Sequence, residues 1–231
     1  MSKILIKVEN MSIGHGKKNL FNNICLEIHE GDCIMLCGAN GSGKTTFLKA
    51  LRDKAGDIAT MIPTRIPKIE GFTLAEFIRI SCYRHSDMGG RLSETQEAAL
   101  LEAMESLGIK SLADRDISTL SDGEFQKAGI AAAIAMDASL ILLDEPTAFL
   151  DAENRMSILS ILRELCIREG KAVVFSTHDL HDGREAATKI FALGADKVFR
   201  QGDEDEFEML IKSIFSSGET SPIKKFQKKQ S

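Results

Sequence analysis

The sequence has no tryptophan and only one tyrosine and four prolines in 231 residues. It also has no apolar run of the roughly eighteen residues that a membrane span needs. We therefore expect neither a membrane-crossing helix nor a secretory leader in this chain. Basic residues are not in excess, since 29 of them stand against 34 acidic ones, and this balance argues against nucleic acid as a partner. An apolar share of 43% is typical of a globular protein with a sizeable core.

The cysteines do not form a metal-binding or disulfide pattern. Five of them are scattered along the chain, and none belongs to a CxxC pair. An odd number of cysteines argues against a disulfide framework, and the absence of the spacing found between zinc ligands argues against a zinc site. Because their neighbours are apolar, we predict core thiols in a reducing cytosol. The five are Cys25, Cys33, Cys37, Cys82 and Cys166.

Apolar strand patterns alternate with helical patterns along most of the chain. Two strand patterns open the sequence, at 4–9 and 23–30. Continuous apolar strands that alternate with helices predict an α/β fold with a largely parallel sheet covered on both faces. The later strands are predicted at 33–37, 57–63, 139–143 and 171–176, with a closing hairpin over 192–202.

The middle of the chain carries helical patterns and no strand pattern. We predict an all-helical insertion over about 71–136, within a core made of residues 1–70 and 137–218. Residues 219–231 hold four lysines and are predicted to form a mobile basic tail. A solvated tail is a more common explanation for such lysines than contact with lipid.

The strongest motif is GANGSGKTT, which fits the pattern G-x-x-x-x-G-K-[ST] between an apolar strand and a helix. Its glycines allow successive backbone N–H groups to face inward, and the following helix adds its positive end, so the loop suits phosphates. We expect Lys44 to neutralise the β- and γ-phosphates of a nucleotide and Thr45 to bind Mg²⁺. A purely structural glycine turn is the alternative. The predicted ATP-binding residues here are Gly38, Ala39, Asn40, Gly41, Ser42, Gly43, Lys44, Thr45 and Thr46.

Two further strands end in residues suited to phosphate chemistry. SLILLDEPT places Asp144 and Glu145 after an apolar strand, at the sheet edge where the phosphate loop also begins. Asp144 is predicted to reach Mg²⁺, and Glu145 to polarise the attacking water. VVFSTHDL brings His178 to the same edge, where imidazole can hydrogen-bond the γ-phosphate or that water. The alternatives are ordinary capping roles for the carboxylates and a loop histidine.

In the order GANGSGKT, LSDGE, LLDEPT and STHD, these motifs resemble the nucleotide-binding subunits of the ATP-binding cassette family. The resemblance implies a P-loop NTPase core with a mixed, largely parallel sheet and an N-terminal antiparallel β portion. It implies ATP hydrolysis with ATP and Mg²⁺ as cofactors, and a homodimer when ATP is bound. In such a dimer Ser121 and Gly123 of one copy complete the ATP site of the other, and Asp151 crosses the interface. By itself, LSDGE would be only a helix N-cap, and the two interpretations are compatible.

Three positions depart from the family pattern. The segment LSDGE, which we call the signature turn, has Asp122 where the family has a glycine. Asp122 adds negative charge beside the expected γ-phosphate. Thr64 stands where the family has a glutamine that contacts Mg²⁺ and water, so its metal role is doubtful. His15 takes the place of an aromatic residue that stacks on adenine, and imidazole can also stack.

The insertion is similar to the helical lobes of ATPase subunits that energise import of iron-siderophore, haem and cobalamin chelates. This similarity implies integral membrane permease subunits as partners, a substrate-binding protein indirectly, and a cytoplasmic location on the inner face of the membrane. The alternatives are a soluble cassette ATPase, for example in iron–sulfur assembly, and a module that binds ATP without hydrolysing it. Several apolar residues are candidates for a groove that receives a permease helix, or for plain core packing. They are Phe72, Leu74, Phe77, Ile78 and Tyr83.

Overall fold

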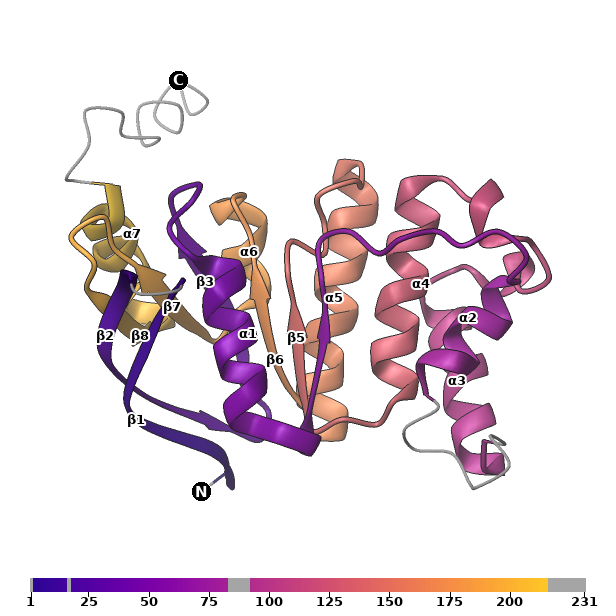
Figure 1. Ribbon diagram of the computed structural model, residues 1–231, viewed down its shortest axis with the longest axis horizontal. Coiled ribbons are helices and arrows are strands. Elements are labelled where there is room, and N and C mark those ends of the chain that lie inside the picture. The colour runs from indigo at the N-terminus through magenta and orange to yellow at the C-terminus, as the bar shows by residue number, and fades with distance from the viewer. Residues whose placement is uncertain (1, 16–17, 83–91, 216–231) are drawn as a thin grey trace.

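A six-stranded sheet in the order β4-β5-β6-β3-β7-β8 forms the centre of the structure (Figure 1). The structure is a computed structural model that describes residues 2–15, 18–82 and 92–215. Neighbouring strands are parallel except for β8, which is antiparallel to β7. The strands are β3 (Cys33–Gly38), β4 (Ala59–Ile62), β5 (Leu140–Leu143), β6 (Ala172–Ser176), β7 (Lys189–Leu193) and β8 (Phe199–Asp203).

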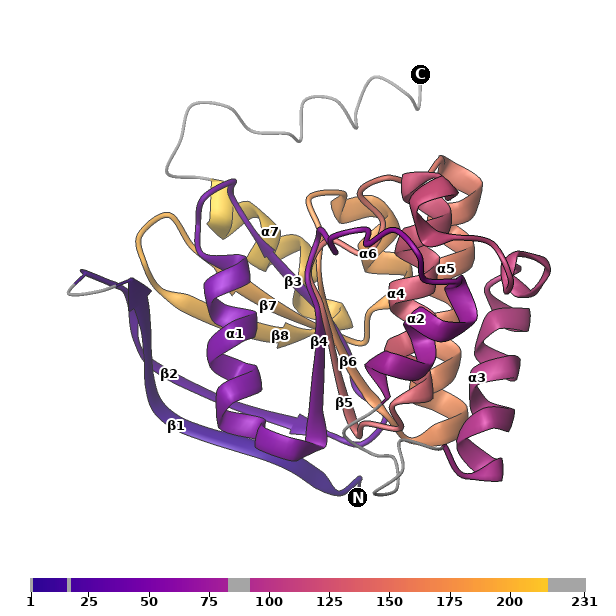
Figure 2. The same ribbon diagram turned by 45° about the vertical axis from the view of Figure 1, so that its right-hand side comes forward.

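Two long strands form a separate antiparallel sheet that covers one face of the molecule. They are β1 (Ile4–His15) and β2 (Lys18–His29), and their register shifts at several irregular positions. The strands predicted at 4–9 and 23–30 are therefore parts of longer ones. Helix α1 (Lys44–Ala55) lies between this sheet and the central sheet, as Figure 2 shows. Its Phe47, Leu48 and Leu51 are fully buried there.

Both faces of the central sheet are buried, as the continuous apolar strands predicted. In β3, Ile34 and Leu36 belong to the core beneath α1, whereas Cys33 and Met35 belong to the core on the opposite face. This alternation follows from the two-residue period of a strand. The second core includes residues of the remaining helices, α2 (Leu74–Ser81), α3 (Glu94–Ser106), α4 (Asp122–Ala135), α5 (Ala152–Glu169), α6 (Leu180–Ala186) and α7 (Phe207–Phe215).

The chain between β4 and β5 builds a helical lobe from α2, α3 and α4, on the right of Figure 1. Each of these helices begins with a capping box, in which a Ser or Thr and the residue three positions later exchange hydrogen bonds. Within the described part of this stretch there is no strand, only an isolated bridge between Thr73 and Asp116. The exact limits of the insertion remain a prediction, and the basic tail lies outside the described residues.

The proposed apolar groove in this lobe is largely core. Leu74 and Ile78 are fully buried, so they have no surface to offer a partner helix. Phe72 and Phe77 are half-buried against the same core, and the Phe77 ring lies 5.1 Å from that of Phe125. The groove interpretation is therefore wrong for Leu74 and Ile78, while Tyr83 lies outside the described residues.

Two local predictions also need correction. The strand expected at 57–63 is only Ala59–Ile62, because residues Gly56–Ile58 form a 3-10 turn before it.

Four of the five cysteines are buried as expected, but Cys25 is exposed on β2. Burial raises the pKa of the Cys37 thiol to about 12, so this thiol stays protonated at neutral pH. All five cysteines are free thiols.

Within the described ranges, no helix combines the length and the apolar character that crossing a bilayer requires.

Helix α5 provides a test of the core. Leu162 is fully buried and belongs to the core opposite α1, so Leu162→Ala leaves a cavity. We expect the free energy of unfolding to fall by about 2–5 kcal/mol, measured by urea denaturation. Ile167 on the same helix is 69% exposed. The control Ile167→Ala is expected to change stability by no more than about 0.5 kcal/mol. Equal losses in both variants would contradict the assigned face of α5.

Candidate nucleotide site

The phosphate loop follows β3 and leads directly into α1. Gly41 and Gly43 have φ values of 75° and 104°, in a region that favours glycine. Gly38 is needed for a different reason, because an added Cβ would lie 2.6 Å from Ser42 Oγ. The loop is closed by a hydrogen bond of 3.0 Å from Ser42 N to Ala39 O. The sequence GANGSGKTT thus adopts the tight turn that its glycines predicted.

Several features of this loop suit an anion. The first turn of α1 has no acidic residue, so the positive end of the helix is unopposed. Lys44 is 7% exposed, and its Nζ donates to Gly38 O at 3.2 Å. Ser42 Oγ is a buried polar atom without a hydrogen-bond partner. A phosphate oxygen would satisfy both groups, so the loop fits the phosphates of ATP.

A chain of hydrogen bonds joins the loop to the neighbouring strand ends. Thr45 Oγ1 donates to Asp144 Oδ2 at 2.7 Å, and Ser176 Oγ donates to Asp144 Oδ1 at 2.8 Å. Asp144 follows β5, and Ser176 ends the adjacent parallel strand β6. The side chain of Asp144 is therefore fixed through both of its oxygens. This arrangement brings together the two predicted ligands of Mg²⁺, Thr45 and Asp144.

The chemistry of these two oxygens fits Mg²⁺. Mg²⁺ prefers octahedral oxygen coordination and is usually held by one or two protein groups together with phosphate oxygens and water. Among the described residues, no group of three or more His, Cys, Asp or Glu side chains is gathered as a metal cage. A hydroxyl and one carboxylate beside a phosphate loop are therefore the expected protein share of such a site.

Glu145 has an unusual backbone conformation for its residue type. Its φ is 51°, a left-handed conformation that is uncommon outside glycine, asparagine and aspartate. Its backbone N–H donates to Ser176 Oγ at 2.9 Å, which helps to hold this conformation. Its carboxylate Oε2 lies 3.6 Å from Nδ1 of His178, whose side chain is 63% exposed. Strain of this kind is often found at functional sites.

The phosphate loop and the strand ends line one pocket of about 490 Å³. Thr64, which follows β4, is one of its lining residues, so the position of the missing glutamine does lie at the site. The backbone of His15 ends β1, but its side chain lies outside the described part of the structure. The pocket is lined by Leu20, Asn40, Gly41, Gly43, Lys44, Thr45, Thr46, Thr64, Asp144 and Glu145.

The signature turn LSDGE begins α4 and lies in a different pocket. Ser121 Oγ accepts a hydrogen bond from Glu124 N at 3.2 Å, and the Glu124 carboxylate accepts one from Ser121 N at 2.7 Å. The Ser121 hydroxyl also interacts with the Glu124 carboxylate and, after the backbone hydrogen bond, helps to hold the pKa of that carboxyl below its usual range. Gly123 is closely packed, since an added Cβ would lie 3.1 Å from Leu150 Cδ2. The structure thus shows the capping role of this turn.

Asp151 lines the same pocket as Ser121 and Gly123. It begins α5 as an N-cap, accepting from Asn154 N at 2.8 Å, and this backbone hydrogen bond holds the pKa of its carboxyl below the usual range. This second pocket has a volume of about 540 Å³ and shares no lining residue with the phosphate pocket. Within one chain, the signature turn and the phosphate loop thus belong to separate sites.

Ser176 is a candidate positioning residue that the sequence did not single out. Its hydroxyl contacts both Asp144 and the backbone of Glu145, so it positions the two predicted carboxylates. A polar residue at the end of the apolar run AVVF was the available signal. Side chains at the ends of adjacent parallel strands lie close together, and this rule would have joined Ser176 to Asp144.

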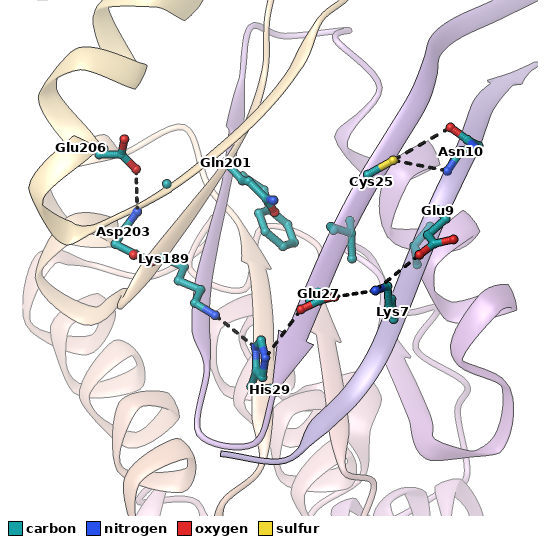
Figure 3. A pocket seen from close by; sticks show the side chains of 14 residues that line it. Lys7, Glu9, Asn10, Cys25, Glu27, His29, Lys189, Gln201, Asp203 and Glu206 are labelled. Carbon is teal, nitrogen blue, oxygen red and sulfur yellow. Dashed lines mark hydrogen bonds and ion pairs between the residues drawn. The ribbon is translucent and has the colours of Figure 1, made fainter. Parts of the chain in front are cut away.

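A larger hollow of about 650 Å³ lies elsewhere, between the two-stranded sheet and the edge made by β7 and β8. Figure 3 shows that the charged side chains around it pair with one another. Lys7 Nζ lies 3.1 Å from Glu27 Oε1 and 3.4 Å from Glu9 Oε1. Lys189 Nζ lies 3.4 Å from His29 Nδ1. We therefore assign the candidate site to the pocket of about 490 Å³, which is lined by the phosphate loop, Lys44, Thr45 and Asp144.

Comparisons with known proteins identify the family of this chain. The sequence model of the ABC transporter family matches residues 21–148. The iron(3+)-hydroxamate import ATP-binding protein of Bacillus subtilis is 29% identical over 234 residues, which cover 91% of this chain and 87% of that protein. Many other known proteins match as well.

Solved structures share the fold. A putative metal-chelate type ABC transporter in an inward-facing conformation matches with a TM-score of 0.81 and 25% identity, covering 94% of this chain and 90% of the matched chain. A dimeric ATP-binding cassette in a post-hydrolysis state with ADP and Pi matches with a TM-score of 0.71 and 24% identity, covering 88% of this chain and 99% of the other. The predicted fold class and family resemblance are confirmed. The family model matches more than half of the length of this chain, so the chain belongs to the ABC transporter family. It is an ATP-binding cassette ATPase that uses ATP with Mg²⁺.

Proposed function

We propose that this ATPase is the nucleotide-binding subunit of an importer, and that two copies close around two ATP molecules during hydrolysis. The observation that carries the proposal is the hydrogen-bonded set Thr45, Asp144, Ser176 and Glu145 beside the phosphate loop. It combines an anion site, an oxygen pair for Mg²⁺ and a fixed carboxylate for water.

In the proposed reaction, the loop N–H groups and Lys44 bind the phosphates and orient the γ-phosphate. Bound Mg²⁺, held by Thr45 and Asp144, would neutralise charge that develops on the phosphate oxygens. Glu145 would orient the attacking water and accept its proton, and His178, 3.6 Å from Glu145, would hydrogen-bond the water or the γ-phosphate.

The proposed dimer rests on the separation of the two pockets. The signature turn shares no lining residue with the phosphate pocket of its own chain, which supports a role in the ATP site of another copy. Ser121 and Gly123 would bind the γ-phosphate held by the partner, with Asp151 beside them. The dimeric state of the matched cassette supports a dimer of this chain.

We further propose that a separate membrane permease is the partner and a metal chelate the cargo. The metal-chelate transporter and the iron(3+)-hydroxamate relative support this class of substrate. The subunit would then lie on the cytoplasmic face of the membrane, bound to its permease, with a substrate-binding protein acting on the far side. Co-purification of this chain with a permease from native membranes tests the partner, and recovery of the chain free of any membrane protein would favour a soluble cassette ATPase.

Lys44→Ala removes the buried ammonium of the phosphate loop. We expect ATP binding to become undetectable in a titration with a fluorescent ATP analogue, because only neutral dipoles then face the phosphates. An affinity within a few-fold of that of the unmodified protein would rule out the phosphate-loop assignment.

Glu145→Gln keeps the size of the side chain and removes its ability to accept a proton. We expect phosphate release to slow by about 10²–10⁴-fold while ATP binding persists. The ATP-bound dimer should accumulate and be visible by analytical ultracentrifugation. Normal turnover in this variant would assign the base to another residue.

Ser121→Arg tests whether the signature turn works in the partner's site. The added bulk should block dimer closure and hydrolysis, whereas ATP binding to the monomer should survive. Mixing this variant with Lys44→Ala creates heterodimers that have one intact site and one doubly damaged site. Part of the ATPase rate should return in the mixture, but not in a chain that carries both changes. If Ser121→Arg hydrolyses ATP normally, the turn is only a helix cap and the dimeric mechanism fails.

A further inference from the structure

The start of α4 carries more negative charge than an anion site should. Asp122 replaces a glycine of the signature, and Glu124 follows two residues later. The backbone N–H of Ser121 donates to Glu124 and holds the pKa of that carboxyl below its usual range, so Glu124 is ionised. Two carboxylates beside a phosphate repel it unless a cation compensates.

The structure contains such a cation at Lys68. Its Nζ donates to Asp122 Oδ1 at 2.9 Å and to Leu120 O at 2.7 Å. The same ammonium lies 5.6 Å from the centre of the Phe125 ring. The Asp122 carboxylate, the Leu120 carbonyl and the Phe125 ring therefore all lie against the Lys68 ammonium. The Lys68 side chain is 25% exposed.

The loop that carries Lys68 is docked on the helical lobe. It runs over 63–73, from β4 to α2, and is the purple loop that leads to the helical lobe in Figure 1. Ile66 packs so closely on α4 that a Cβ at Gly129 would lie 2.5 Å from Ile66 Cδ1. At its far end, Gly71 N donates to Asp116 Oδ2 at 2.8 Å. These contacts on both sides of Lys68 limit where its ammonium can lie.

The ion pair between Lys68 and Asp122 contributes little to the stability of the fold. The Asp122 side chain is 73% exposed, and pairs of this kind contribute little to folding. Its effect on charge is more important, because Asp122 lines the pocket that also contains Ser121 and Gly123. Lys68 is not part of that lining, and it reaches the pocket only through its hydrogen bond to Asp122. The same loop also brings Thr64 into the phosphate pocket of its own chain. The loop over 63–73 thus connects the phosphate pocket of one copy to the signature turn that, in the proposed dimer, completes the site of the other copy.

We propose that Lys68 is a positioning residue for hydrolysis: it neutralises Asp122 and holds the signature turn so that the turn can accept the γ-phosphate of a partner's ATP. This inference rests on the proposed function. It predicts that Lys68 is needed because Asp122 is present, and that the need disappears when the carboxylate is removed.

A double-mutant cycle tests this dependence. In a chain that also carries Glu145→Gln, ATP-induced dimerisation is measured by analytical ultracentrifugation, with and without Lys68→Met. We expect Lys68→Met to weaken dimerisation about tenfold, and to weaken it less than about threefold when Asp122→Gly is also present. The same pattern is expected in ATPase rates of chains with Glu145 intact. ATP affinity of the monomer, which depends on Lys44, should stay within about twofold.

Two further variants complete the design. Lys68→Arg keeps the charge and should dimerise within about threefold of the parent, since guanidinium also pairs with carboxylate. Lys3→Met removes an ion pair of 3.2 Å with Glu30, far from the signature turn, and should change nothing.

The possible failures are distinguishable. Equal losses from Lys68→Met with Asp122 present or absent would reduce Lys68 to a structural contact and overturn the inference. Dimerisation unaffected by Lys68→Met, in a protein that Ser121→Arg inactivates, would overturn it as well while leaving the proposed function intact. If Glu145→Gln does not dimerise with ATP at all, the proposed function itself fails.

Discussion

The hydrogen bond between Thr45 and Asp144 joins the two halves of the site, because it connects the first turn of α1 with the end of β5. These residues are 99 positions apart, and only the parallel pairing of β5, β6 and β3 brings them together. The carboxyl ends of parallel strands meet at one edge of a sheet, so Asp144 and Glu145 after β5 and Ser176 at the end of β6 lie there beside the phosphate loop after β3. The apolar core on both faces of the sheet thereby fixes the relative positions of the polar groups at its edge.

Much of this arrangement was predictable because it depends on local chemistry. Glycines 38, 41 and 43 predicted the turn, and the apolar strands before Asp144 and His178 predicted their common edge. The family resemblance then supplied the role of LSDGE, which spacing alone would have left as a helix cap. The structure shows the cap at Ser121, and the use of this turn in a partner's site remains a proposal.

What the sequence did not reveal depends on contacts between distant segments. Lys68 and Asp122 are 54 residues apart, so the charge of Asp122 looked uncompensated until the loop after β4 was placed against α4. Leu74 and Ile78 looked suitable for a partner helix because apolar residues have the same pattern in a groove and in a core. Cys25 has apolar neighbours in the sequence, yet it points outward because successive residues of a strand face opposite sides.

The hydrogen bond from Lys44 to Gly38 O has a consequence for the thermodynamics of nucleotide binding. The loop already has its turn, its helix start and its ammonium in place, so phosphates arrive at an ordered structure and exchange one partner of Lys44 for another. Little chain entropy is lost in such an exchange, in contrast to loops that fold around their ligand. The favourable enthalpy of the new charge-assisted hydrogen bonds is then opposed mainly by the dehydration of the phosphates and of the ammonium, and scarcely by ordering of the loop.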